Sequence, residues 1–420
     1  MRKTESQEIA LSKSAASHTT ADPMLTEIVR RQKIAAELLA PSEEEQCRTG
    51  YFHTLREILQ QPSTWLATGR QLASLAPSLR ETIAGVRALV LTGSGSSEYA
   101  ADCVRIPLQN RLGIPVQVIG GGALLTHAGK AILPGRPALM VSFARSGDSP
   151  ESVGAVSLLL DTEPEIRHLV LTCNKDGRLA TTWPANPNDP RVRSIILDQR
   201  TNDRSLVMTS SYTNMVLAAH ALGLLPDPQS IVTLSENLSR AAADLLLAHF
   251  DSIAELGRSN FQRIVYLASG ATLGAARESA LKMLEMTAGR VWSMHESYLG
   301  LRHGPMSAVH ADTLIVCFLS SDPLVRAYEC DLIRELNRKQ LGQSKIVFGS
   351  SIPADLARPG DLLIDCPGLA ACGDDAAPIL HILIGQLLGF FRSMQQGLKP
   401  DAPSATGVIS RVVGTFQLHR

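Results

Sequence analysis

Short apolar runs alternate with helical patterns along the middle of the chain. Four of these runs have the length of buried strands: 88–92, 115–119, 138–143 and 168–172. Helical patterns follow the first run over 98–109 and the third run as far as Leu160. Strands that alternate with helices usually form a parallel sheet covered on both faces, so the pattern predicts an α/β fold here.

The same order of strands and turns returns 175 residues later. The run around Gly95 (LVLTGSGSSEYAAD) is echoed around Gly270 (VYLASGATLGAAR), and the run from Leu139 (LMVSFARSGD) is echoed from Leu314 (LIVCFLSSDP). Any two strand–glycine–helix units resemble each other by chance, but a shared order at one offset favours a duplicated α/β unit. The chain is therefore predicted to contain two such units.

Helical patterns flank the two units. Apolar residues recur at helical spacing over 23–40, 54–61 and from Trp65 to the segment before Gly85, and again over 378–394. Residues 1–22 are rich in Ser, Thr, Ala and Lys and have no apolar segment for export. We therefore expect five parts: a disordered tail (1–22), a helical lead-in (23–84), a first domain (85–225), a second domain (226–395) and a C-terminal tail that docks on the active site (396–420).

Composition narrows the class of protein. The 420 residues are 45% apolar and their formal charges sum to zero, which does not suggest nucleic acid as the main partner. No apolar run is long enough to span a membrane. The seven cysteines include no CxxC pair or metal-site spacing. We expect reduced thiols in a cytoplasmic protein, with no metal and no membrane partner.

Serine-rich turns mark the first unit. Five serines and an arginine lie where two of its strands lead into helices, namely Ser94, Ser96, Ser97, Arg145, Ser146 and Ser149. Hydroxyl groups and free backbone N–H groups at the carboxyl edge of a parallel sheet suit a phosphate monoester. The turns lack a Walker A lysine and a dinucleotide fingerprint. The alternative is that these serines only cap helices.

A charged helix marks the second unit. Glu278, Lys282 and Glu285 fall on one face of the helical pattern, and a later loop carries His303 in the sequence RHGP. Carboxylate, amine and imidazole form a plausible acid–base set, and a lysine beside Glu285 favours a carboxylate that acts as a base. The alternative is an exposed face of ion pairs. Four apolar residues are expected to pack around this face: Leu281, Met283, Leu284 and Met286.

Other polar residues receive simpler interpretations. Asp102 and Arg105 are expected to form a surface pair. His295 and Glu296 lie in the loop before His303, and for these two residues we leave open whether they line the site. Four histidines in or beside apolar segments are interpreted as packed or surface residues: His127, His168, His220 and His381.

With these residues placed, the chain resembles the SIS (sugar isomerase) family from about Tyr51 to Arg420. It is similar to double-SIS proteins related to the isomerase half of glucosamine-6-phosphate synthase. The segments that carry the resemblance are TLREILQQP, GSGSSEYA, ARSGDSPES, ALKMLEM, LRHGP, PILHILIGQLLGFF and the tail DAPSATG…SRVV. The segments ARSGDSPES, SLVMTSSYTNM and HESYLGLRHGP most resemble the group called AgaS, which is associated with galactosamine and tagatose 6-phosphates as a deaminase/isomerase.

The resemblance implies two tandem flavodoxin-like SIS domains, no cofactor and a role for each candidate residue. Glu285 would move a proton between C1 and C2 with support from Glu278 and Lys282, and His303 would open the sugar ring, from the neighbouring subunit of a homodimer. The implied phosphate ligands are Ser96, Ser97, Arg145, Ser146 and Ser149, and the implied sugar contacts are Gly95, Thr209, Ser210 and Arg411.

The chain departs from the synthase in two ways. Nothing before Tyr51 resembles a glutaminase with a cysteine nucleophile, which favours deamination or isomerisation over synthesis. The tail position near the sugar carbonyl is Arg411 instead of lysine, and arginine stays protonated and forms no Schiff base. Three interpretations remain open: an amino-sugar-phosphate deaminase, an isomerase or deglycase without net deamination, and a sugar-phosphate sensor. A sensor needs neither Glu285 nor His303, and no DNA-binding helix is visible.

Overall fold

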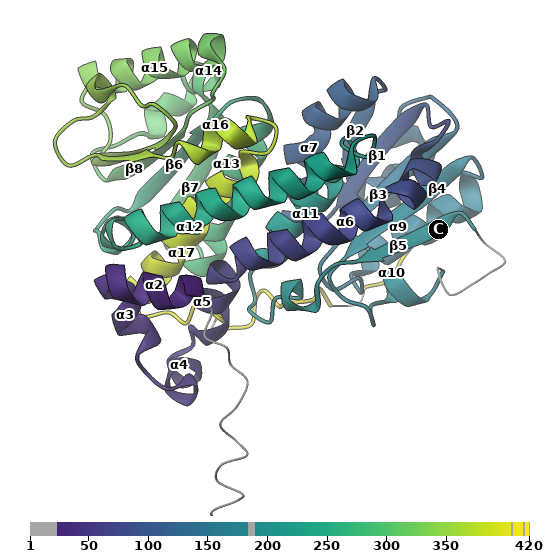
Figure 1. Ribbon diagram of the computed structural model, residues 1–420, viewed down its shortest axis with the longest axis horizontal. Helices are drawn as coiled ribbons and strands as arrows, with labels where there is room; N and C mark the ends of the chain where they lie inside the picture. The colour runs from purple at the N-terminus through teal and green to yellow at the C-terminus, as the bar shows by residue number, and fades with distance from the viewer. Residues whose placement is uncertain (1–22, 184–189, 405, 415, 420) are drawn as a thin grey trace, which may run out of the picture.

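The computed structural model describes residues 23–183, 190–404, 406–414 and 416–419. It consists of two lobes, each built on a five-stranded parallel sheet (Figure 1). The tail predicted to be disordered, 1–22, lies outside the described residues. None of the described helices is long and apolar enough to cross a membrane.

The two sheets have the same strand order. The first sheet runs β2 (Val116–Gly120), β1 (Ala88–Gly93), β3 (Ala138–Ala144), β4 (Ile166–Thr172) and β5 (Val192–Ile196). The second runs β7 (Trp292–Ser297), β6 (Arg263–Ala268), β8 (Thr313–Phe318), β9 (Ser344–Gly349) and β10 (Leu362–Asp365). All neighbouring strands are parallel. This shared topology confirms the duplicated α/β unit.

Helices cover both faces of each sheet. The first unit carries α7 (Ser96–Leu112), α8 (Gly121–His127), α9 (Pro150–Thr162), α10 (Arg178–Thr181) and α11 (Ser210–Ala221). The second carries α13 (Leu273–Met286), α14 (Tyr298–Leu301), α15 (Pro323–Arg338), α16 (Gly368–Cys372) and α17 (Pro378–Gln395). Short 3₁₀ turns lie at Ala128–Ala131, Gln199–Thr201, Gly270–Thr272, Pro305–Ala308 and Ala354–Leu356.

The lead-in consists of α2 (Pro23–Arg31), α3 (Lys33–Leu39), α4 (Glu43–Thr49), α5 (Phe52–Leu59) and α6 (Gln61–Ile83). The long helix α12 (Pro228–Arg258) packs against α6 and α17 between the lobes (Figure 1). The chain after α17 crosses from the second lobe to the first, where Leu418 lies beside Gly154 of α9 (Figure 1). The tail therefore reaches the serine-rich half of the fold.

One hydrophobic core joins the lobes. The facing sides of both sheets and the helices between them bury a single apolar cluster that includes Leu91, Tyr212, Leu246, Phe318 and Phe391. The outer face of each sheet has its own smaller cluster, under α9 in the first unit and under α15 in the second. Because α7 and α13 pack on each other within the shared core, residues 175 positions apart meet across the boundary between the units.

Several expectations need correction. Leu284 is exposed and Leu281 is only half-buried, whereas Met283 and Met286 are buried as expected. Asp102 pairs with Arg277 at 2.6 Å, and not with Arg105. The predicted helix over 23–40 is divided at Gln32 into α2 and α3. Of the four histidines interpreted as packed or surface residues, His168, His220 and His381 are buried and His127 is exposed.

Candidate active site

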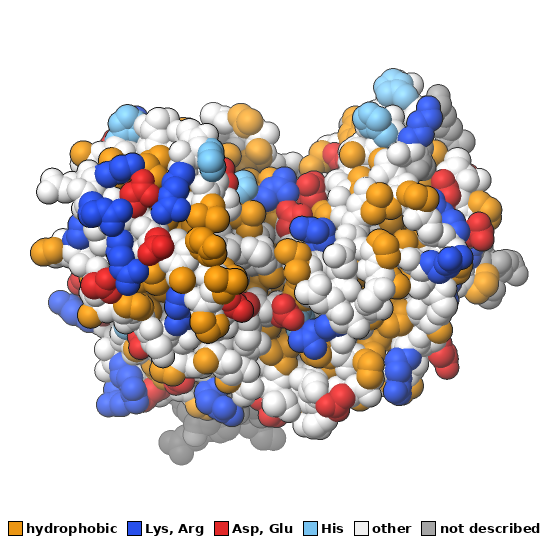
Figure 2. Space-filling model, turned by 90° about the horizontal axis from the view of Figure 1, so that it is seen from above, with side chains coloured by type: hydrophobic (Ala, Val, Ile, Leu, Met, Phe, Trp, Pro, Cys, Tyr) orange, Lys and Arg blue, Asp and Glu red, His pale blue; other side chains and the backbone are white. Residues whose placement is uncertain are grey.

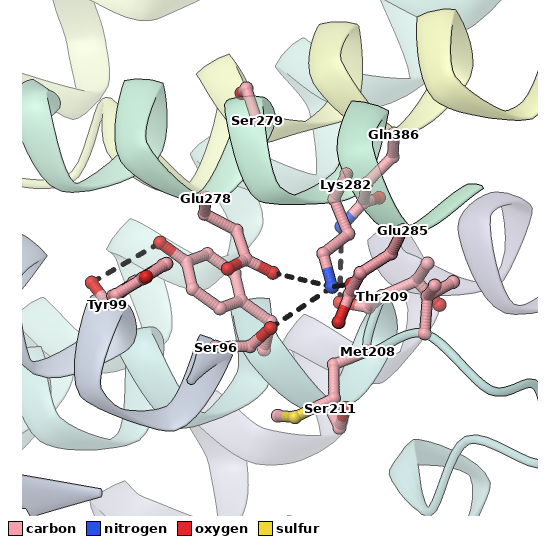
Figure 3. A network of polar contacts seen from close by, with 12 residues as sticks. Ser96, Tyr99, Met208, Thr209, Ser211, Glu278, Ser279, Lys282, Glu285 and Gln386 are labelled. Carbon is pink, nitrogen blue, oxygen red and sulfur yellow. Dashed lines mark hydrogen bonds and ion pairs between the residues drawn. The ribbon is translucent and has the colours of Figure 1, made fainter. Parts of the chain in front are cut away.

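The amine of Lys282 lies at the centre of a buried polar cluster between α13 and α7. Its Nζ donates to Glu285 Oε2 at 2.5 Å and to Ser96 Oγ at 3.1 Å, and it lies 3.2 Å from Glu278 Oε1. The two carboxylates and the hydroxyl surround the ammonium group (Figure 3). The face of α13 that was predicted to be either catalytic or solvated is therefore turned into the protein.

Burial sets the charges of this cluster. The side chains of Lys282 and Glu278 are fully buried, whereas that of Glu285 is 23% exposed. Burial raises the pKa of Glu278 to about 7, although Lys282 lowers it. Burial lowers the pKa of Lys282, but its two carboxylate partners outweigh this and the net direction is upward. The lysine is therefore held as a cation, and Glu285 is the carboxylate of the pair that substrate can reach.

A second cluster forms a cavity of about 110 Å³ at the carboxyl edge of the first sheet. Its lining contains two guanidinium groups and no carboxylate. The polar lining residues are Ser94, Ser97, Arg145, Ser146, Ser149, Ser152 and Arg411. The Ser94 hydroxyl is buried and has no hydrogen-bond partner among the described residues. A concentration of donors with no acidic side chain suits a phosphate group.

The two arginines of this cavity bond residues 202–206, a segment that lies behind the lining residues and that we call the cavity wall. Arg145 donates through Nη1 to the carbonyls of Ser205 (3.1 Å) and Leu206 (3.0 Å), and through Nη2 to the carbonyl of Arg411 (2.6 Å). Arg411 donates in turn to the Asp203 carbonyl (2.7 Å) and to Asn202 Oδ1 (2.6 Å). The C-terminal tail thus forms one side of the cavity.

The structure separates two neighbouring serines that were predicted to act together. Gly95 has a φ of 58° and ends the turn at the start of α7. Ser97, the second helical residue, lines the anion cavity, whereas the Ser96 hydroxyl accepts from Lys282 and is not part of the cavity lining. Ser96 is therefore placed with the acid–base cluster and not with the phosphate ligands.

The proposed sugar contacts are less open than expected. Ser210 is fully buried, and its hydroxyl donates to Asp203 Oδ1 at 2.5 Å, so it is held by the carboxylate that also accepts from the backbone N–H group of Ser211 at the start of α11. Thr209 is also buried, but its hydroxyl has no partner among the described residues. Thr209 lies beside Glu285 and Lys282 (Figure 3). Of the two, only Thr209 has a hydroxyl without a hydrogen-bond partner among the described residues, and Thr209 lines neither the anion cavity nor the cavity beside Glu285.

Glu285 also lines a larger cavity of about 540 Å³ between the end of α13 and the tail. Leu281, Leu284 and Ala288 line it on the helix side, and Ser404, Thr406 and Val408 on the tail side. His303 does not line this cavity or the anion cavity. It is exposed in the loop after α14, and its side chain forms no hydrogen bond or ion pair with any described residue. A single chain therefore does not bring His303 to Glu285.

A third cavity, of about 370 Å³, lies between α7 and the start of α13. His295 lines it together with Asp102, Arg105 and Arg277, so this histidine does not lie in the Glu285 cavity. Figure 2 shows a notch between the lobes on one face of the molecule, with charged side chains of both signs along it. Arg277 is already paired with Asp102 and Glu98. The lining of this cavity therefore has two guanidinium groups, Arg105 and Arg277, and one carboxylate, Asp102.

Two buried carboxyl groups behind the anion cavity were missed. Asp203 accepts from the backbone N–H groups of Thr209 and Ser211, both at 2.8 Å, and Glu57 accepts from that of Arg204 at 2.5 Å. Neither residue lies in a recognisable motif. Only the burial of the surrounding segment shows that these two carboxyl groups accept its backbone N–H groups.

With this geometry described, known proteins can be compared. No family model matches the chain. The D-galactosamine-6-phosphate deaminase AgaS of Escherichia coli O157:H7 is 33% identical over 371 residues, which cover 87% of this chain and 95% of the relative. The chain belongs to the AgaS family.

Solved structures agree with this assignment. The tagatose-6-phosphate ketose/aldose isomerase of Escherichia coli superposes with a TM-score of 0.77 and is 32% identical, covering 85% of this chain and 95% of that one. The C-terminal domain of glucosamine-fructose-6-phosphate aminotransferase from Francisella tularensis superposes with a TM-score of 0.68 at 19% identity, over 84% of this chain and 98% of that one. The second match shows that this chain shares the fold of that domain.

Proposed function

We propose that this protein converts galactosamine 6-phosphate and water to tagatose 6-phosphate and ammonia. The observation that carries the proposal is the turn 94–97. Ser97 faces the two-arginine cavity, while its neighbour Ser96 bonds the lysine that pairs with Glu285. One turn of the chain thus places a phosphate site beside an acid–base cluster, as a sugar 6-phosphate requires. Relatives of the AgaS family support the choice of sugar.

The phosphate would bind in the cavity lined by Ser97, Ser146, Ser149, Arg145 and Arg411. The N-terminus of α7 and the serine hydroxyls would donate to its oxygens, and the guanidinium groups would neutralise its charge. Thr209 would contact a sugar hydroxyl. This anchors one end of the open chain and leaves C1 and C2 to reach Glu285.

The reaction would begin with ring opening. His303 would take the proton of the anomeric hydroxyl and deliver one to the ring oxygen, giving the open-chain aldehyde. Glu285 would then remove the C2 proton, and the C2–H electrons would form an enaminol as the aldehyde oxygen gains a proton. Return of a proton from Glu285 to C1 gives a ketimine, which water hydrolyses to ketose and ammonia. Proton transfer by a positioned side chain of this kind typically contributes about 10²–10⁴-fold.

The proposal includes a homodimer, because His303 is exposed, lines neither cavity and bonds none of the described residues of its own chain through its side chain. A second copy could place this histidine in the open cavity beside Glu285. The exposed Leu284, at 46%, and Leu299, at 44%, would give such an interface apolar contacts. The active site would then lie between subunits.

We expect His303→Ala to lower turnover by about 10- to 100-fold, less than loss of the base, because sugar rings also open in water. Mixing His303→Ala with Glu285→Gln chains tests the shared site. If each histidine serves the neighbouring subunit, random mixing restores about a quarter of wild-type activity, because half of the dimers contain one intact site. Mixed dimers that stay inactive place the histidine in its own subunit.

A substrate panel separates the proposal from its rivals. The purified protein is given galactosamine 6-phosphate, glucosamine 6-phosphate and tagatose 6-phosphate, and both ammonia and sugar products are measured. The proposal predicts ammonia release that is fastest with galactosamine 6-phosphate. Isomerisation of tagatose 6-phosphate without ammonia from either amino sugar would favour an isomerase, and binding without any product would favour a sensor.

A further inference from the structure

Glu57 lies on the lead-in helix α5 and is buried beneath the segment that forms the wall of the anion cavity. It is 6% exposed, and its Oε1 accepts from the backbone N–H groups of Arg204 (2.5 Å) and Ser205 (3.2 Å). Its Oε2 bonds the Ser205 hydroxyl. Helix α5, which lies outside both α/β units, thus fixes the conformation of residues 204 and 205.

The geometry around Ser205 indicates that Glu57 carries a proton. The Ser205 hydroxyl bonds the Val207 carbonyl at 3.0 Å as well as Glu57 Oε2. A hydroxyl has one hydrogen and a carbonyl can only accept, so the hydroxyl donates to Val207. The hydrogen of the other bond must then come from the carboxyl group. Burial, and after it the negative charge of Asp203, raises the pKa of Glu57 to about 8, which also favours the protonated carboxyl group.

The segment that Glu57 fixes is the one that both arginines hold. The carbonyls of Ser205 and Leu206 accept from Arg145, and the carbonyl of Asp203 accepts from Arg411. The Leu206 N–H donates to the carbonyl of Asp401 in the tail at 2.9 Å. Displacement of this segment would therefore move two cations and the tail together.

The tail also returns to the same helix. The Asp401 carboxylate accepts from the backbone N–H groups of His53 (3.2 Å) and Thr54 (2.7 Å) and so caps the start of α5. Helix α5 therefore contacts the tail at one end and the cavity wall at Glu57. The lead-in, the wall and the tail form one connected unit.

We propose that Glu57 is a positioning residue for the substrate phosphate: by fixing residues 204 and 205 it orients Arg145 and, through Arg145, the tail that closes the cavity. The inference rests on the assignment of this cavity to the phosphate. Glu57 does not line the cavity, so it acts through the arginine.

The charged groups around Glu57 make the expected affinity of the cavity for an anion depend on pH. Asp203 acts on Glu57 from the wall, and Glu57 acts on Arg145 in the turn after β3. Arg411 from the tail and Glu285 from α13 act on Arg145 in turn. With Glu57 neutral, the groups behind the phosphate are two cations, Arg145 and Arg411, and one anion, Asp203. Ionisation of Glu57 as the pH rises through about 8 adds a second anion, which weakens attraction for a dianion.

Two variants test this role with sulfate, whose charge is constant above pH 6, and with galactosamine 6-phosphate. Glu57→Gln keeps an acceptor for the two N–H groups and a donor for Ser205, as a protonated carboxyl does. It is expected to bind sulfate within about threefold of wild type at pH 7. Wild-type affinity should fall roughly three- to tenfold from pH 7 to pH 9, whereas that of Glu57→Gln should stay flat.

Glu57→Ala removes the contacts and is expected to raise the Kd for sulfate and the KM for substrate roughly tenfold, with a smaller change in kcat. The matched control is Glu329→Gln, which neutralises a buried carboxylate in the second unit, whose pKa burial raises to about 7, and should change neither Kd nor its pH dependence. A pH dependence in Glu57→Gln equal to that of wild type overturns the proposal, even if Glu57→Ala does not fold. Because sulfate binding is measured without turnover, failure to release ammonia would count against the proposed function and not against Glu57.

Discussion

Glu285→Gln is expected to lower turnover by about 10²–10⁴-fold while substrate affinity stays within a few-fold of wild type. The amide keeps the size of the side chain and can still lie beside Lys282, but it cannot accept the C2 proton. Because Glu285 does not line the anion cavity, the phosphate contacts remain. The measurements are kcat for ammonia release and the Kd for galactosamine 6-phosphate.

The matched control is Glu37→Gln, which removes the charge of an exposed glutamate on α3 and should leave both quantities unchanged. Full turnover in Glu285→Gln would show that another group removes the proton. A large loss of affinity with unchanged kcat would instead make Glu285 a binding residue.

Lys282→Met is expected to lower the free energy of unfolding by about 3–5 kcal/mol at pH 8, because it leaves Glu278 buried without its cation. Activity should also fall, since Glu285 loses its partner at 2.5 Å. The stability deficit should shrink as the pH falls from 8 towards 7, because without the lysine the pKa of Glu278 lies higher than in wild type. Glu278 has a raised pKa even beside the lysine, and a protonated carboxyl is less costly to bury than a carboxylate.

Chemical denaturation at pH 6 and pH 8 checks this prediction. The control is the double variant Lys282→Met/Glu278→Gln, which leaves no fully buried charge in the cluster and only the partly exposed Glu285 without its partner, and which should recover most of the lost stability. A single variant as stable as wild type at pH 8, or a deficit that is the same at both pH values, would contradict a buried ion pair in the folded protein.

Strands buried on both faces could be predicted because they are continuous apolar runs. All residues of β1, β3 and β8 are buried. The strands that were missed, β5, β7 and β10, lie at the edges of the sheets or are only partly buried, and β7 contains His295, Glu296 and two serines. Their pairing depends on the neighbouring strand, which local periodicity does not reveal.

The site was predictable where one segment carried several polar groups. The serine turns and the face of Glu278, Lys282 and Glu285 follow from spacing alone. Spacing could not show that Lys282 is buried, nor that Ser96 and Ser97 face different clusters, because both depend on how α7 packs on α13. Glu57 and Asp203 are single carboxyl groups that meet only because α5 packs under the loop before α11. No local pattern indicates such contacts.

The most direct test of the account uses galactosamine 6-phosphate that carries deuterium at C2. Proton transfer by Glu285 from C2 to C1 requires that this deuterium leave C2. The account predicts one ammonia for each tagatose 6-phosphate, with the deuterium found at C1 of the ketose or in the solvent, and loss of both products in Glu285→Gln. Absence of ammonia with the wild-type protein, or ammonia released with the deuterium still on C2, would contradict it.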